Sequence, residues 1–123
     1  MGRHVRCTTR RCGRLWAEHH PPKCSNRDPR ACPPEVIRLE HIGEPEAHWL
    51  IEIPGCESSW EPEQVSGPND GLYQFNVSTW ASTPFAAHSP LSAYWSTRAA
   101  AWGYRHLEHG PGEWQCTGIL GLG

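Results

Sequence analysis

The clearest hydrophobic pattern in the chain lies between residues 91 and 109. Apolar and aromatic side chains recur there at intervals of three or four residues, which is the spacing of one face of an α-helix. The residues on this face are Leu91, Trp95, Ala99, Trp102 and His106. Ser89-Pro90 precedes the pattern and Gly110-Pro111-Gly112 follows it, and such residues typically start and stop a helix. The sequence therefore predicts an amphipathic helix from Leu91 to His109.

Shorter patterns before this helix predict further helical segments joined by turns. Apolar residues between positions 36 and 42 predict a short helix or turn, and residues 46–60 follow a partly helical period. The stretch 62–71 is rich in turn residues and predicts a loop or a small hairpin. Asn76 is expected to cap a helix that runs to Trp80. We therefore expect a mostly helical α+β fold with little sheet.

The first 33 residues differ from the rest because they show no hydrophobic periodicity. Such a segment cannot fold by burying a core, so cross-links or a metal ion must hold it if it is ordered. It ends in Cys32-Pro33-Pro34, and consecutive prolines interrupt regular structure. The predicted organisation is an irregular Cys-rich unit (1–33), a helical domain (34–118) and a C-terminal tail (119–123).

Four cysteines in this first unit have a spacing that resembles a stretched zinc ribbon: Cys7, Cys12, Cys24 and Cys32. Four thiolates can bind Zn²⁺ tetrahedrally and fold a segment that has no core. The intervals differ from the usual two-residue knuckle, and two local disulfides are the alternative. Three histidines are further candidate ligands or solvated surface residues: His4, His19 and His20. Structural zinc is the favoured interpretation, and no cofactor is expected for catalysis.

The sign of the net charge also changes after residue 33. The 123 residues carry a formal net charge of −2, with +6 in residues 1–33 and −8 in residues 34–123. Phosphate contacts need basic residues, so the acidic domain argues against a nucleic-acid-binding protein. No apolar run approaches the roughly 18 residues of a membrane span, and the first 30 residues lack the apolar region of a secretory signal. We therefore expect neither a membrane anchor nor a signal peptide.

Three short motifs follow one another in the helical domain. They are Cys56-Glu57-Ser58, then Gly71-Leu72-Tyr73-Gln74-Phe75 with Ser78-Thr79-Trp80, and finally Gly110-Pro111-Gly112-Glu113-Trp114-Gln115-Cys116. With these three motifs in this order, the chain resembles the resuscitation-promoting factors and related transglycosylase-like domains of actinobacteria and their phages. The second motif also looks like the Gly-Leu-Met-Gln element of lytic transglycosylases. The resemblance covers roughly 85 of the 123 residues, from about Pro34 to Cys116.

The resemblance implies a compact lysozyme-like fold that cleaves the glycan strands of peptidoglycan between N-acetylmuramic acid and N-acetylglucosamine. Glu57 would be the general acid at the end of a helix that faces the substrate cleft. A disulfide between Cys56 and Cys116 is also implied, with two buried free thiols as the alternative. Families of this kind act with one Glu and can use the N-acetyl group of the substrate as the second participant.

Four further residues are candidates for substrate binding. By the resemblance, Gln74 lines the cleft and hydrogen-bonds the substrate or Glu57. Tyr73 and Trp60 could form the wall that raises the pKa of a buried Glu. Tyr73 is also a candidate to stack on a sugar, as is Trp80, for which core packing is the favoured alternative. Asp70 is the nearest candidate for a second carboxylate, which in many glycosidases stabilises the transition state or holds a water. Glu61 and Glu63 lie behind it as weaker candidates.

Two departures from the pattern bear on activity. Pro54 stands three residues before Glu57, where proline is expected to break or kink a helix. If a new turn begins there, the dipole at its N-terminus would lower the pKa of Glu57, the wrong direction for an acid. The Ala-Tyr-Asn element of lytic transglycosylases, whose Tyr orients the Glu, is missing. Hydrolysis and 1,6-anhydro sugar formation therefore both remain open.

The leading hypothesis is a phage-borne peptidoglycan glycosidase, carried by a virion tail or released to the bacterial cell wall. Its partners would be glycan strands and other phage tail proteins. The alternative is a non-catalytic protein that binds cell wall or builds the tail while retaining the fold.

Overall fold

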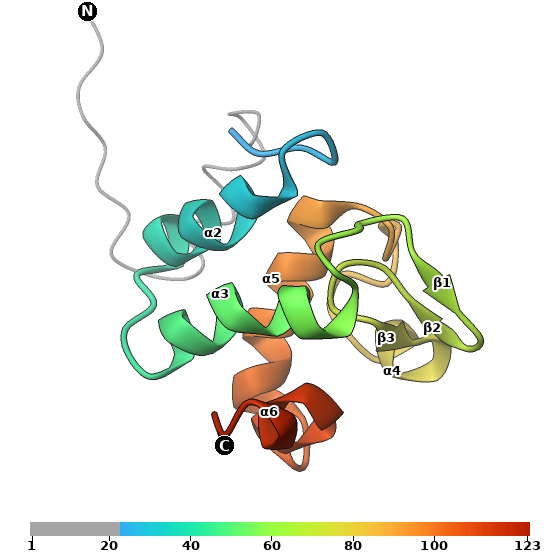
Figure 1. The fold of residues 1–123 in the computed structure, drawn as a ribbon. Coiled ribbons are helices and arrows are strands. Elements are labelled where there is room, and N and C mark those ends of the chain that lie inside the picture. The colour runs from blue at the N-terminus through green and yellow to red at the C-terminus, as the bar shows by residue number, and fades with distance from the viewer. Residues whose placement is uncertain (1–22) are drawn as a thin grey trace, which may run out of the picture.

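The computed structural model describes residues 23–123, which form a mostly helical α+β fold (Figure 1). The predicted fold class is therefore confirmed at this level. The elements in chain order are η1 (Pro29–Ala31), α2 (Cys32–Glu40), α3 (Glu46–Glu57), β1 (Val65–Ser66), β2 (Asn69–Asp70), β3 (Phe75–Asn76), α4 (Val77–Ala81), α5 (Ala93–His106), η2 (Gly110–Glu113) and α6 (Gln115–Ile119).

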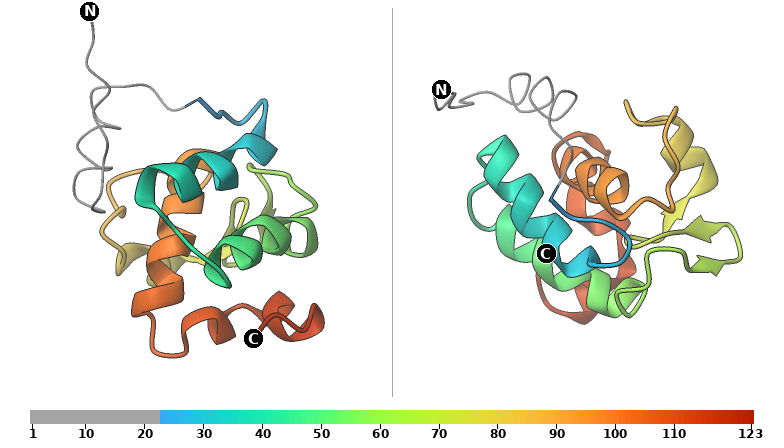
Figure 2. Two further views of the ribbon diagram at one scale, coloured as in Figure 1. Left: turned by 90° about the vertical axis from the view of Figure 1, so that its left-hand side faces the viewer. Right: turned by 90° about the horizontal axis from the view of Figure 1, so that it is seen from above.

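Helix α5 is the central element of the fold. It contacts α2, α3 and η2, and α3 in turn contacts α6. The three short strands form an antiparallel sheet in the order β1-β2-β3, with Asn69 opposite Asn76 and Asp70 opposite Phe75. This sheet and α4 lie to one side of the helices, as two views show (Figures 1 and 2). Among residues 23–123, no helix combines the length and the apolar character needed to cross a membrane.

The long helix was predicted correctly, but the face predicted to be buried is only partly the one that the helix buries. It spans Ala93–His106 and is capped by Ser92, whose side chain accepts a hydrogen bond from the Trp95 amide. Ala99, Ala100 and Ala101 are all fully buried, whereas Trp95 is only partly buried and His106 is exposed. Small side chains let neighbouring helices approach α5 from several directions. The bulky residues of the predicted face therefore lie at the edge of the contacts between α5 and its neighbours.

Helix α3 continues through Pro54 and ends at Glu57, so the predicted break is wrong. Proline has no backbone N–H, and it therefore leaves the carbonyl four residues earlier without its helical partner. That carbonyl belongs to Leu50, and it accepts a hydrogen bond of 2.7 Å from the Tyr73 hydroxyl. A side chain from the second motif thus replaces the bond that Pro54 removes. Glu57 consequently lies at the C-terminal end of a helix and not near an N-terminus.

The predicted boundary after residue 33 is misplaced, because residues 23–33 pack on the domain. Cys24 and Cys32 are buried and form a disulfide, and the Asn26 side chain hydrogen-bonds to the Leu91 carbonyl and the Ala93 amide. The prolines after Cys32 begin α2 instead of ending a unit, since the first helical turn needs no N–H donor.

The predicted zinc site is therefore wrong for two of its four ligands. Cys24 and Cys32 are joined as a disulfide and are not thiolates. Residues 23–123 contain no group of three or more His, Cys, Asp or Glu side chains that could hold a metal ion. The remaining candidates lie outside the described residues: Cys7, Cys12, His4, His19 and His20.

The C-terminal tail predicted for residues 119–123 is also partly incorporated into the domain. Ile119 is the last residue of α6, and Leu122 packs against the core while its amide donates to the Thr117 carbonyl. The predicted cap of α4 is confirmed, because Asn76 accepts a hydrogen bond from the Ser78 amide.

An aromatic cluster at the centre of the core supports the region where the three motifs meet. The indole of Trp114 packs edge-on against Trp49 and Phe75, with ring centroids 4.9 and 5.4 Å apart. Its Nε1 donates to the Tyr73 carbonyl, and Nε1 of Trp49 donates to Thr117 Oγ1. These bonds satisfy the polar ends of buried indoles, so the cluster holds the second and third motifs against α3, the helix whose end carries the first motif.

Candidate functional site

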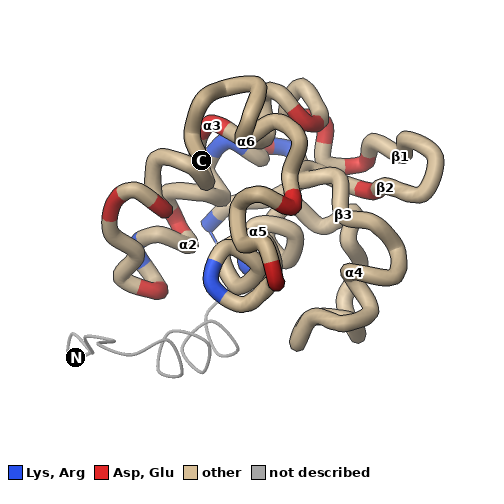
Figure 3. Tube along the Cα trace, turned by 90° about the horizontal axis from the view of Figure 1, so that it is seen from below, with Lys and Arg blue, Asp and Glu red and all other residues tan. Residues whose placement is uncertain are grey.

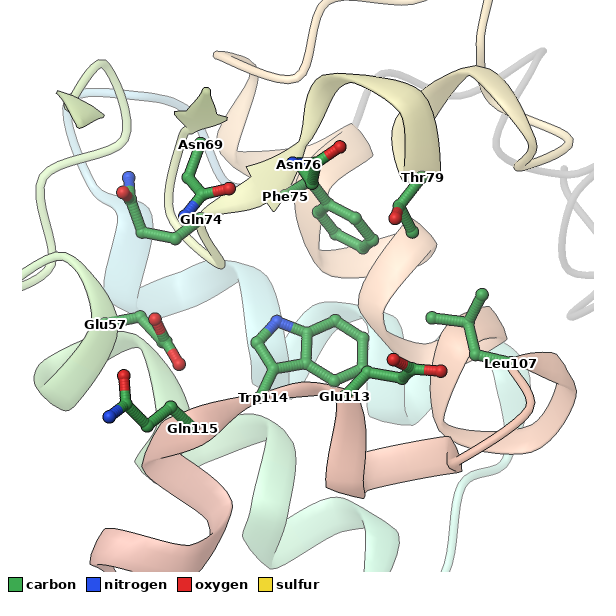
Figure 4. A pocket seen from close by; sticks show the side chains of 10 residues that line it. All are labelled: Glu57, Asn69, Gln74, Phe75, Asn76, Thr79, Leu107, Glu113, Trp114 and Gln115. Atoms are coloured by element: carbon green, nitrogen blue, oxygen red, sulfur yellow. The ribbon is translucent and has the colours of Figure 1, made fainter. Parts of the chain in front are cut away.

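A cavity of about 300 Å³ opens where the C-terminal end of α3, the small sheet and the segment after α5 come together (Figure 4). All three sequence motifs contribute to its wall. The lining residues are Glu57, Asn69, Gln74, Phe75, Asn76, Thr79, Leu107, Glu113, Trp114 and Gln115. Most of these side chains are polar, and the apolar ones are Phe75, Leu107 and Trp114 (Figure 4).

Glu57 projects its carboxyl group into this cavity from the last residue of α3 (Figure 4). Burial raises the pKa of the Glu57 carboxyl above its ordinary value of 4.5, and a hydrogen bond from the Cys116 amide opposes this rise. The amide nitrogen lies 3.3 Å from Glu57 Oε2. The pKa shift favours the protonated form, which is the direction a general acid needs and the opposite of the shift expected from a break at Pro54.

The predicted disulfide between Cys56 and Cys116 is confirmed, with a Cα–Cα distance of 6.0 Å. It joins the residue before Glu57 to the residue whose amide binds the Glu57 carboxylate. The cross-link therefore attaches the closing motif, with Trp114 and Gln115, to the end of α3. Two walls of the cavity are covalently held together at the position of the acid.

Gln74 lines the cavity, as the resemblance implied. Its Nε2 donates to the carbonyls of Gly71 and Gln64, at 2.9 and 3.2 Å. Because both N–H groups of the side-chain amide donate to these carbonyls, Oε1 is the atom left to accept a hydrogen bond from a ligand. The backbone of Gln74 has a φ of 50°, a left-handed conformation that is uncommon for a residue other than glycine. Such backbone geometry is enriched at functional sites.

The turn that carries Gln74 requires glycine at position 71. Gly71 has a φ of 85°, and a Cβ atom added there would lie 2.1 Å from the Pro90 carbonyl oxygen. No side chain fits in that space. The glycine of the second motif thus allows the loop to pack directly against the segment that precedes α5.

Asparagine side chains on neighbouring strands form the wall opposite Glu57. Asn69 on β2 and Asn76 on β3 are directly paired in the sheet, and both line the cavity (Figure 4). Asn76 Oδ1 accepts hydrogen bonds from both the amide and the hydroxyl of Ser78, which leaves Nδ2 as a donor. Together with Gln74, this wall offers both donors and acceptors, as recognition of sugar hydroxyl and acetamido groups requires.

The structure places the other predicted substrate-binding residues elsewhere. Tyr73 is fully buried under the site, where burial raises the pKa of its hydroxyl and where that hydroxyl bonds to Leu50. It cannot stack on a sugar, so that prediction is wrong. Trp60 lies beside Arg30, with 5.1 Å between its ring and the guanidinium carbon, and Asp70 pairs within the sheet. Neither residue lines the cavity, and neither do Glu61 and Glu63.

The second carboxylate of the cavity belongs to Glu113, which was not among the site residues predicted from the sequence. The segment around it was interpreted only as the stop of the preceding helix and the start of the closing motif. A usable signal was present, because the expected Cys56–Cys116 disulfide brings the residues just before Cys116 close to Glu57. An acidic residue there was a candidate for the cavity wall on that ground.

No protein-family model matches the chain, and neither the curated proteins nor the solved structures contain a match for it.

Proposed function

We propose that the protein is a peptidoglycan-cleaving glycosidase with a lysozyme-like fold, in which Glu57 protonates the leaving oxygen. The observation that carries this proposal is the placement of Glu57. It is a half-buried carboxyl at the end of a helix, its pKa is raised by burial, and it opens into a polar cavity. The order of the three motifs, all of which reach this cavity, supports the same assignment.

In this mechanism, the Glu57 carboxyl transfers its proton to the oxygen that bridges two sugars. The bond between that oxygen and the anomeric carbon breaks as positive charge develops on the sugar ring. The acetamido oxygen of the same sugar attacks the anomeric carbon and forms an oxazolinium intermediate. Attack by water, with the proton returned to the Glu57 carboxylate, gives hydrolysis, whereas attack by the O6 hydroxyl gives a 1,6-anhydro sugar.

Gln74 supports this use of the acetamido group. Its amino group is held by two backbone carbonyls, so its Oε1 accepts from the N–H of an acetamido group in the cavity. Accepting this hydrogen bond would orient the acetamido oxygen toward the anomeric carbon and would stabilise the charge that develops on the amide. One carboxyl group and one oriented amide are then sufficient for the reaction.

The site of action that we propose is the bacterial cell wall, reached from a phage virion tail or after release from the infected cell. Two disulfides in residues 23–123 support action in an oxidising environment outside the cytosol.

The proposal is tested by measuring soluble fragments released from purified actinobacterial cell walls. Glu57→Gln removes the proton while keeping the size of the side chain, and Glu61→Gln is a matched control because Glu61 is exposed and lies outside the cavity. We expect Glu57→Gln to lower the release rate by about 10²-fold or more, as for loss of a general acid, and Glu61→Gln to leave it unchanged. Equal release by all three proteins would exclude Glu57 as the acid.

A sedimentation assay on the same walls separates catalysis from binding alone. If no protein releases fragments but all of them sediment with the walls, the chain is a wall-binding protein and the catalytic proposal fails.

A further inference from the structure

The cavity contains a second carboxyl group, that of Glu113, which the proposed reaction does not use. Glu113 lies at the opposite side of the Trp114 indole from Glu57 (Figure 4). Its Oε2 accepts a hydrogen bond of 3.2 Å from the His109 amide, which holds the carboxylate on the wall. The Glu113 Oε1 atom has no such bond within the described part of the chain and is the atom that can accept from a ligand.

Within residues 23–123, no Lys, Arg or His side chain lines this cavity. Two of its ten lining residues are acidic. The ion pairs found in residues 23–123 lie elsewhere and join Arg38 to Glu35, Arg98 to Glu40 and Arg105 to Glu46. Acidic positions also outnumber basic ones along the described trace (Figure 3). Since the proposed reaction needs Glu57 protonated, the carboxylate of Glu113 is the one that provides negative charge, and a concave surface with charge of one sign concentrates ligands of the opposite sign.

We propose that Glu113 is a specificity-determining residue that binds a primary ammonium group carried by the glycan substrate. This inference rests on the proposed function and names the substrate class of the same cavity. Cell-wall glycan carries such a group either on a glucosamine that has lost its acetyl group or on an amine of the peptide stem. The ammonium forms a charge-assisted hydrogen bond with Glu113 Oε1, which a neutral acetamide in the same place cannot match.

The first test compares untreated cell walls with walls treated with acetic anhydride, which converts both kinds of ammonium group to neutral amides. For the wild type, we expect acetylation to slow fragment release about twofold to fivefold, the effect of one exposed charge-assisted contact. Glu113→Gln is expected to release fragments from both walls at the same rate. Glu108→Gln is the matched control, because Glu108 is an exposed carboxylate outside the cavity, and it should behave as the wild type.

The result that would overturn the inference is an equal effect of acetylation on the wild type and Glu113→Gln, or no effect on either. The two sources of ammonium are separated with glycan strands from which an amidase has removed the peptides. If acetylation still slows cleavage of these strands, the group is the sugar ammonium. If the effect disappears with the peptides, the group belongs to the peptide stem.

A binding measurement keeps the inference testable if the wild type cleaves no wall at all. Glu57→Gln is titrated with a glucosamine trimer and with an N-acetylglucosamine trimer, and the dissociation constants are obtained from NMR shift changes. We expect tighter binding of the glucosamine trimer, and loss of this preference in the double variant that also carries Glu113→Gln. Equal binding of the two trimers by Glu57→Gln would exclude the sugar ammonium. If a free stem peptide with an amine also bound no more tightly than its acetylated form, the role of Glu113 would be overturned, whatever the outcome for catalysis.

Discussion

The hydroxyl of Tyr73 donates a hydrogen bond to the backbone carbonyl of Leu50, the group that Pro54 leaves without a partner in α3. The bond spans 23 residues of sequence and lies in the core. It allows a helix with an internal proline to continue for its last turn and to carry Glu57 into the cavity. The second motif thus has two roles. Tyr73 stabilises the last turn of α3, which carries the first motif, and Gln74 lines the cavity.

Replacing Tyr73 by Phe is expected to weaken the fold. The variant keeps the aromatic packing and leaves a buried carbonyl unpaired, which costs about 1–3 kcal/mol. Urea unfolding measures the free energy of unfolding of the wild type and the variant. Tyr104→Phe is the control, since the Tyr104 side chain is only partly buried and also packs against Trp49. Equal losses in the two variants would show that the bond to Leu50 has no special role.

Gly71→Ala is expected to destabilise the protein much more than Gly67→Ala. Both glycines have a positive φ, of 85° and 61°, so both substitutions carry the backbone strain of a left-handed residue. Only at position 71 does the new methyl group also collide with a backbone carbonyl, that of Pro90, whereas nothing lies within 4 Å at position 67. Thermal unfolding should show a clearly lower Tm for Gly71→Ala. Similar Tm values would contradict the close packing described for this loop.

Glu57 is expected to make the stability of the fold depend on pH above 4.5. Because burial raises its pKa, the folded chain keeps a proton that the unfolded chain releases between pH 4.5 and the raised pKa. Its contribution to the free energy of unfolding is therefore fully present below pH 4.5 and falls as the pH rises through this window. The corresponding fall should be absent in Glu57→Gln and retained in Glu61→Gln. A curve for Glu57→Gln that is parallel to the wild type would remove the evidence for a shifted pKa.

The same shift predicts how the activity depends on pH. A general acid must be protonated, so the rate should fall as the pH rises through the raised pKa of Glu57, and the midpoint of this fall should lie above 4.5. The check is a pH profile of wall cleavage at substrate concentrations far below KM. A midpoint at or below 4.5 would indicate that another group limits the reaction.

The two disulfides are expected to differ in their contributions to stability and activity. Cys56–Cys116 closes a loop with a sequence separation of 60, and Cys24–Cys32 one of 8. Chain entropy then gives about 4 kcal/mol for the first and about 2.5 kcal/mol for the second. Each pair is replaced by two serines, and unfolding and wall cleavage are measured on both variants.

At a temperature where both disulfide variants remain folded, only the one that lacks Cys56–Cys116 should lose activity, because only that bond fixes the amide that holds Glu57. Equal activity of the two variants would contradict a positioning role for this disulfide.

The helical elements could be predicted from local patterns, but the buried face of α5 could not. The spacing of Trp95, Ala99 and Trp102 correctly indicated a helix. Which side of it faces the core depends on how closely the neighbouring helices approach, and that is set by Ala99, Ala100 and Ala101. Hydrophobicity alone ranks tryptophan above alanine, so it did not identify Ala100 and Ala101 as part of the buried surface of α5.

The site residues that belong to the recognised motifs or to the disulfide could be predicted from the sequence. Those whose positions depend on contacts between distant segments could not. Glu57, Gln74 and the Cys56–Cys116 disulfide were expected from the order of the motifs. The continuation of α3 through Pro54 depends on a hydroxyl from residue 73, which no local rule anticipates. Glu113 was missed for the same reason, because its place on the cavity wall follows from how the closing motif folds back onto α3.

The most direct test of the central claim is mass spectrometry of the products that the wild type and Glu57→Gln release from purified cell walls. If Glu57 is the acid of a glycosidase, the wild type releases disaccharide-containing fragments that end either in a reducing sugar or in an anhydro sugar that is lighter by one water. Glu57→Gln should release almost none. Fragments with intact glycan strands, or equal amounts of the same fragments from both proteins, would contradict the assignment of Glu57 as the acid of a glycosidase.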